Sequence, residues 1–177
     1  MKQKKIRPVG GLALLFFLAT SVGCSSIHTM TYSPITATVS PTLHPTIRVD
    51  QAISPPHALV VTATKPGRLE FVNVDLPLPL GTAAPKVVGV KVCYQIETSN
   101  SSSTYITQTR LTEMTTPNEA PIMVDDPTDQ TALGPTCYVV DNFSLSPHGS
   151  VVLGLGVIFG STDDKILIGG ITLMFGQ

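Results

Sequence analysis

Hydrophobic and polar residues alternate along most of the chain beyond residue 56, with the period of two that is typical of β-strands. In the segment at 86–97, the residues on one face are Val88, Val90, Val92, Tyr94 and Ile96, and those on the other include Lys91, Cys93 and Gln95. This pattern predicts a half-buried strand. Turn residues bound eight such segments, and we expect strands at 57–64, 68–76, 86–97, 103–114, 121–124, 136–141, 150–159 and 166–175.

Eight short strands with Gly/Pro turns and no helical period predict an all-β fold, a two-sheet antiparallel sandwich that is either jelly-roll-like or immunoglobulin-like. The antibody type of immunoglobulin domain is disfavoured because the chain has no Trp to pack on an inter-sheet disulfide. The composition agrees with this class. Charged residues make up only 13% of the chain, whereas it holds 14 Gly and 15 Pro, which favours strands and turns over helices.

Three local features follow from the same pattern. The apolar alternation slips by one residue between 69–71 and 72–74, which predicts a β-bulge. The last two segments flank the turn-rich residues 160–165, so we expect them to form a hairpin. Gly154 and Gly156 leave one face of the segment at 150–159 with few bulky side chains, which indicates either close packing or a groove for another chain or a ligand.

The N-terminus has the order of an export signal, with basic residues first, an apolar run at 10–19 and then small residues. The run is shorter than the roughly 20 residues that span a bilayer. The sequence Ser21-Val22-Gly23-Cys24 resembles the lipobox of bacterial lipoproteins, although that family usually has Leu where this chain has Ser21. The resemblance implies a signal peptide over 1–23 and diacylglycerol on Cys24. In a two-membrane host, Ser25 after the modified Cys implies the outer membrane.

The alternative is an ordinary secretory signal that leaves Cys24 as a spare thiol. In either case we expect a location in or beyond the cell envelope. Residues 24–56 are rich in Thr, Ser and Pro and predict an extended tether, in which 35–39 and 46–49 alternate weakly enough to be edge strands instead. The globular domain is then expected at 57–177.

Two cysteines remain once Cys24 is assigned to the anchor. Cys93 and Cys137 lie in similar alternating segments, in a compartment that permits oxidation. This predicts a structural disulfide between neighbouring strands or sheets. Metal ligation or redox catalysis would need a second Cys or His close by in the sequence, and there is none.

The charge pattern argues against nucleic acid as a partner. Four of the 11 basic residues lie in the first seven positions, so the exported part has 7 basic and 12 acidic residues, a formal charge of −5. It therefore lacks the clustered positive patch that phosphate backbones require.

Motifs for catalysis are missing from the sequence. There is no H-E-x-x-H pair and no G-x-S-x-G elbow, so we expect no enzyme, and a secreted hydrolase would rest on fold analogy alone. Asp125, Asp126 and Asp129 are candidate calcium ligands, with a solvated turn as the alternative. Asn100 and Tyr105, in or beside a polar loop, are weak candidates for ligand contact. No other cofactor is expected.

These observations favour a lipid-anchored envelope module that binds or scaffolds a partner, either another envelope protein or a polysaccharide. The alternative is a structural subunit that self-associates into a surface layer or fibre, through the slim terminal strands or by strand exchange of the tether.

Overall fold

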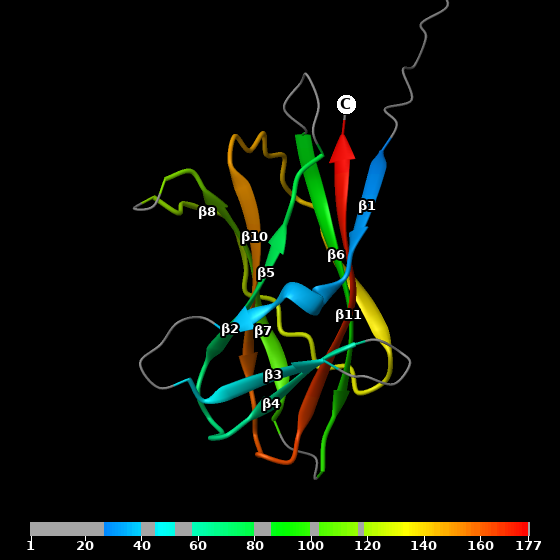
Figure 1. The fold of residues 1–177 in the computed structure, drawn as a ribbon. Helices are drawn as coiled ribbons and strands as arrows, with labels where there is room; N and C mark the ends of the chain where they lie inside the picture. The colour runs from blue at the N-terminus through cyan, green and yellow to red at the C-terminus, as the bar shows by residue number, and fades with distance from the viewer. Residues whose placement is uncertain are drawn as a thin grey trace, which may run out of the picture.

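Strands make up almost all of the regular structure of the chain in a computed structural model (Figure 1). The structure describes residues 27–39, 45–51, 58–79, 86–99, 103–116 and 119–176. The elements are β1 (His28–Tyr32), the 3-10 helix η1 (Pro34–Thr36), β2 (Thr38–Val39), β3 (Ile47–Gln51), β4 (Leu59–Ala63), β5 (Glu70–Leu76), β6 (Lys86–Glu97), β7 (Tyr105–Met114), β8 (Ile122–Asp126), β9 (Thr136–Val140), β10 (Ser150–Ile158) and β11 (Lys165–Gly176). The eight predicted strands correspond to β4 through β11. Within these ranges, no helix is long and apolar enough to cross a membrane.

Two antiparallel sheets form a sandwich. Sheet A has the order β3-β4-β11-β6-β9, with β1 also paired to β11, and sheet B has the order β2-β5-β10-β7-β8. Of the strands from β4 to β11, one layer holds β4, β11, β6 and β9 as neighbours in that order, and the other holds β5, β10, β7 and β8. This strand order is that of a jelly roll, which decides between the two topologies predicted from the sequence.

The predicted hairpin at the end of the chain is wrong, because β10 belongs to sheet B and β11 to sheet A. Each of these strands is central and already has neighbours on both sides, so they face each other across the core instead of pairing. The connection from β6 to β7 crosses between the sheets in the same way. Asp164 holds both crossings together, since its carboxylate accepts hydrogen bonds from the backbone N of Ser99 at 3.0 Å and from the hydroxyl of Thr104.

The predicted bulge near residue 71 is also wrong. β5 pairs with β10 from Glu70 to Leu76 without a change of register. The apparent slip arises because the buried position at the start of β5 is filled by Glu70, which is only 6% exposed, while Phe71 lies on the outer face. The Glu70 carboxylate accepts hydrogen bonds from the hydroxyl of Thr46 at 2.7 Å and from its backbone N at 3.3 Å. These bonds offset the cost of burying the charge.

The core consists of the inward-facing residues of both sheets, as the alternation predicts. Fully buried aliphatic side chains come from the central strands, among them Leu153 and Leu155 of β10 and Ile168, Ile171 and Leu173 of β11. Burial of each such side chain stabilises the fold by roughly 1.5–3 kcal/mol. The sandwich is therefore held mainly by the strands whose pattern is clearest in the sequence.

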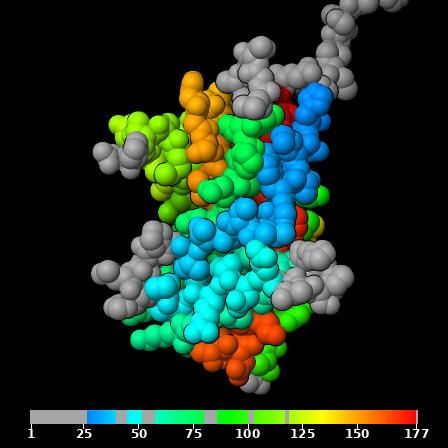
Figure 2. All heavy atoms as spheres, viewed as in Figure 1, coloured from blue at the N-terminus to red at the C-terminus, as the bar shows by residue number. Residues whose placement is uncertain are grey.

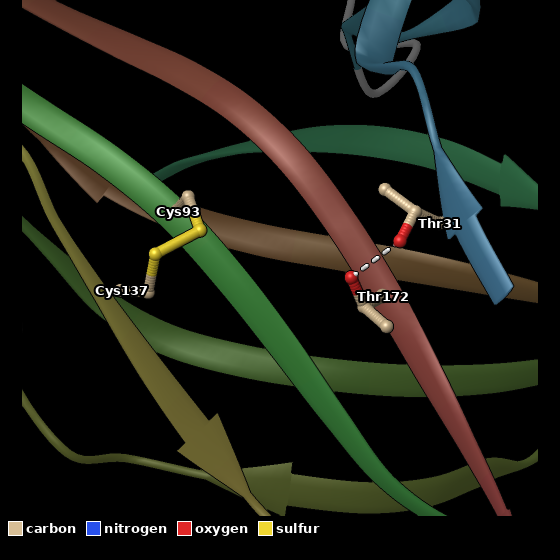
Figure 3. The surroundings of a disulfide bond; sticks show 4 residues. All are labelled: Thr31, Cys93, Cys137 and Thr172. Carbon is tan, nitrogen blue, oxygen red and sulfur yellow. Dashed lines mark hydrogen bonds between the residues drawn. A yellow bond between two sulfur atoms is a disulfide. The ribbon is translucent and has the colours of Figure 1, made fainter. Parts of the chain in front are cut away.

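Much of the segment predicted as a tether belongs to the sandwich. All five residues of β1 pair with β11, β2 pairs with β5, and β3 pairs with β4. Between β1 and β2 the chain crosses from sheet A to sheet B through η1, where Pro34 is buried, and Figure 2 shows this N-terminal segment lying across one side of the molecule. The hydroxyls of Thr31 and Thr172 also form a hydrogen bond of 2.9 Å between β1 and β11 (Figure 3). β2 and β3 are edge strands that correspond to the alternative at 35–39 and 46–49, whereas β1 was not predicted from the sequence.

Candidate functional site

A cleft of about 420 Å³ opens between β8 and β9, which are edge strands of opposite sheets. Its volume lies within the range that accommodates small ligands or a few units of a polymer. Polar side chains from the turn after β8 line one wall. A mainly apolar surface from the end of β9 and the residues that follow forms the other.

The polar wall is held in place by its own hydrogen bonds. Oδ1 of Asp126 accepts hydrogen bonds from the backbone N of Thr128 at 3.0 Å and from its Oγ1 at 2.6 Å. The backbone of Gln130 pairs in both directions with that of Ile106, at 2.7 and 3.1 Å. Among the residues that the structure describes, Oδ2 of Asp126 has no hydrogen-bond partner, so it can accept a hydrogen bond from a ligand. A wall ordered in advance lowers the entropic cost of binding.

The opposite wall combines apolar surface with one amide. Val139 lies on the outer side of β9 and is 47% exposed, and Phe143 is half-buried with its ring packed against the core. Asn142 lies between them in the lining and is exposed, so its side chain offers both a donor and an acceptor. The two walls thus present hydrogen-bonding groups opposite an apolar surface.

A buried tyrosine connects the two edge strands. The hydroxyl of Tyr138 on β9 forms a hydrogen bond of 2.7 Å with that of Thr109, which is paired with Asp126 in the sheet. Burial raises the pKa of Tyr138 well above its ordinary value. The hydrogen bond to Thr109 lowers this pKa somewhat, and electrostatic interactions with Tyr94 and Asp126 raise it again. Tyr138 therefore stays a neutral phenol and ties the sheets together near the cleft.

The predicted calcium ligands do not converge. Asp125 is on the outer face of sheet B, where its carboxylate forms an ion pair with Arg110 at 3.1 Å and accepts a hydrogen bond from Gln108. Asp129 is exposed, and Asp126 forms the turn already described. In the described parts of the chain, no group of three His, Cys, Asp or Glu side chains is arranged to hold a metal ion. The structure thus shows the turn that was the alternative to calcium.

The predicted disulfide is confirmed. Cys93 of β6 and Cys137 of β9 lie directly opposite each other in sheet A and are bonded (Figure 3). The bridge lies on the outer face of the sheet, beside a mainly apolar groove of about 400 Å³ whose other side includes Gly169 and Gly170. Gln95 and Thr136 are polar side chains in its mainly apolar lining, and neither forms a side-chain hydrogen bond with another described residue, so this groove is a weaker candidate site than the cleft.

The remaining sequence candidates lie apart from the cleft. Tyr105 begins β7 and is half-buried against the core, while Asn100 and Cys24 lie outside the described residues. Gly154 and Gly156 leave no open groove. A Cβ added at Gly156 would lie 2.9 Å from the Cβ of Gln108, and one at Gly154 would lie near the Phe71 ring. Close packing is therefore the reason for these glycines.

Sequence reasoning found Asp126 but missed Gln130, Asn142 and Phe143. Their only signal is that polar residues follow strands on either side of the cleft, and this is equally typical of ordinary turns. The two walls are about a dozen residues apart in the chain, and they meet only because β8 and β9 are edge strands of opposite sheets.

No protein-family model and no curated protein matches the chain. Among solved structures, the CBM22-1 xylan-binding domain of Xyn10C from Paenibacillus barcinonensis is similar, with a TM-score of 0.50 and 10% identity over 82% of this chain and 92% of that one. The CBM36-1 domain of a xylanase from the hindgut metagenome of Trinervitermes trinervoides has a TM-score of 0.48 at 10% identity, covering 82% of this chain and 96% of that one. At this level of identity the likeness to the CBM22-1 domain concerns the fold alone.

Proposed function

We propose that this protein is a lipid-anchored module of the cell envelope that binds a neutral polysaccharide in the cleft between β8 and β9, without catalysing a reaction. The observation that carries the ligand class is the pairing of a pre-ordered polar wall with an apolar one. A pyranose ring has hydroxyls around its rim and C–H groups on its faces, so it can use both walls at once.

Each wall has a distinct part in this proposal. Oδ2 of Asp126 accepts a hydrogen bond from a sugar hydroxyl, and the amides of Gln130 and Asn142 donate or accept others. Phe143 and Val139 pack against the apolar face of the ring. The carboxylates of Asp126 and Asp129 make the turn negative, which disfavours uronic acids and other anionic sugars.

The anchored location rests on the sequence at Cys24. The disulfide between Cys93 and Cys137 supports an oxidising compartment outside the cytoplasm. A sandwich fold shared with a xylan-binding domain is compatible with a polysaccharide ligand, but the ligand class is argued from the cleft.

Self-assembly is less well supported than binding. The slim face at Gly154 is covered by its own neighbours, and the residues proposed for strand exchange pair within the chain's own sheets.

Affinity electrophoresis tests the proposal. The protein is run through gels that contain neutral polysaccharides (xylan, mixed-linkage glucan and mannan) and through gels that contain anionic alginate. We expect at least one neutral polymer to retard the protein and alginate not to.

Asn142→Ala should weaken retardation about tenfold, because the substitution removes one or two hydrogen bonds in a pocket. Asn73→Ala, on β5, which β10 and β7 separate from β8, is the matched control and should behave as wild type. Unaltered retardation of Asn142→Ala would place the ligand elsewhere.

A further inference from the structure

The distance between the proposed anchor and the folded domain is very short. β1 begins at His28, four residues beyond Cys24. Even a fully extended chain of four residues spans only about 14 Å. All five residues of β1 are paired with β11, and Tyr32 at its end donates a hydrogen bond of 2.6 Å to the carbonyl of Pro77. The chain is therefore part of the sandwich almost from the anchor onwards.

Only one end of the sandwich can lie near such an anchor. His28 pairs with Phe175 near the end of β11, and Figure 1 shows the start of β1 and the C-terminus at the same end of the molecule. β11 runs for 12 residues, so its start at Lys165 is roughly 40 Å away. The loops that carry Asp164 and Leu69 are at that distant end.

The near end also carries exposed apolar side chains. Ile27, which precedes β1, is 61% exposed, and Met30, within β1, is 39% exposed although its backbone pairs with Leu173. A lipid surface within 14 Å would cover side chains of this kind, since apolar groups next to a lipidated terminus partition into the headgroup and acyl boundary.

We propose that the β1 end of the sandwich rests directly on the lipid surface that holds Cys24, with Ile27 and Met30 in contact with it, and that no spacer lifts the domain away. This inference depends on the proposed anchor but not on the ligand of the cleft. Asp126 pairs with Thr109, five residues from the end of β7, so the cleft lies about 17 Å along the strand from this end of the sandwich.

Single-tryptophan variants can test this orientation because the native chain has no Trp. The full-length lipidated protein carrying Ile27→Trp or Leu69→Trp is reconstituted into vesicles of brominated phosphatidylcholine with phosphatidylglycerol, and its fluorescence is compared with that in non-brominated vesicles. Leu69 is a matched control, since it is 48% exposed and precedes β5 at the opposite end. We expect Ile27→Trp to lose at least about half of its emission and Leu69→Trp to lose almost none.

A second variant keeps the test independent of either tryptophan position. Insertion of a flexible Gly/Ser linker of about ten residues between Ser26 and Ile27 should restore the emission of Ile27→Trp. Absence of quenching at residue 27 in protein whose mass includes the acyl chains would overturn the inference. Equal quenching of both variants, or an unmodified mature N-terminus, would also overturn it. Retardation by polysaccharide is measured separately, so failure of the cleft proposal would leave the quenching result intact.

Discussion

Replacement of the buried Asp164 should strongly destabilise the domain. Its side chain is fully buried immediately before β11, between the two crossings that join sheet A to sheet B. The carboxylate accepts hydrogen bonds from the backbone N and hydroxyl of Ser99 and from the hydroxyl of Thr104, which itself accepts one from the backbone N of Gly160. The substitution Asp164→Ala removes the acceptor from these donors of Ser99 and Thr104.

The magnitude depends on which donors water can reach. Thr104 is only 4% exposed, and its hydrogen bond to a charged acceptor is worth about 1.5–3 kcal/mol. Ser99 is exposed, so water replaces the carboxylate there and each of its two bonds contributes only about 0.5 kcal/mol. We therefore expect Asp164→Ala to lower the free energy of unfolding by about 3 kcal/mol, a large part of the 5–15 kcal/mol typical of a domain.

Urea unfolding of the mature chain carrying Cys24→Ser measures this difference by linear extrapolation. The neighbouring Asp163 is exposed and provides a control with the same change of charge. Asp163→Ala should lie within about 0.5 kcal/mol of the parent protein. If Asp164→Ala and Asp163→Ala unfold at the same urea concentration, the buried carboxylate does not hold the two crossings together and the reasoning is refuted.

Three further predictions concern the bridge, the buried tyrosine and a glycine. Substitution of both Cys93 and Cys137 by Ser opens a loop with a sequence separation of 44 residues and should lower the free energy of unfolding by up to about 4 kcal/mol. Urea unfolding measures this loss, and a value below about 1 kcal/mol would contradict the loop-entropy argument. Because burial raises the pKa of Tyr138, this side chain keeps its proton in the folded state at a pH where the unfolded chain loses it, so stability should fall as pH rises above about 10. Tyr138→Phe should flatten this alkaline decrease in Tm, and an unchanged pH profile of the variant would contradict the role of Tyr138. Gly156→Ala should lower stability by about 1 kcal/mol because its Cβ would overlap a side chain of β7, whereas Gly134→Ala, where the Cβ meets nothing within 4 Å, should be neutral by the same assay.

The amino-acid sequence alone determined the strands of the jelly roll. An inward side chain every second residue is a local property, so the alternation from Val90 to Ile96 marks β6 without knowledge of its neighbours. The pairing of Cys93 with Cys137 followed equally directly, because only two cysteines remained after Cys24.

Partnership between strands was decided only in three dimensions. The alternation in β10 and β11 is the same whether the two strands pair as a hairpin or face each other across a core. The two arrangements differ only in which strands pair with β10 and β11 in the sheets, and the sequence does not show this. Buried Glu70 was misread for a similar reason. A charged residue at an inward position breaks the local pattern, and its partner Thr46 lies 24 residues away.

The cleft and the role of residues 28–51 also required the tertiary structure. Asp126 and Asn142 are ordinary turn residues in the sequence, and they line one cleft because the edges of two sheets meet there. The Thr- and Pro-rich segment after Cys24 has the composition of a spacer, since short strands at the edge of a sheet bury few apolar side chains. Backbone hydrogen bonds to β11, β5 and β4 make its strands β1, β2 and β3 part of the domain, and no local pattern encodes those partners.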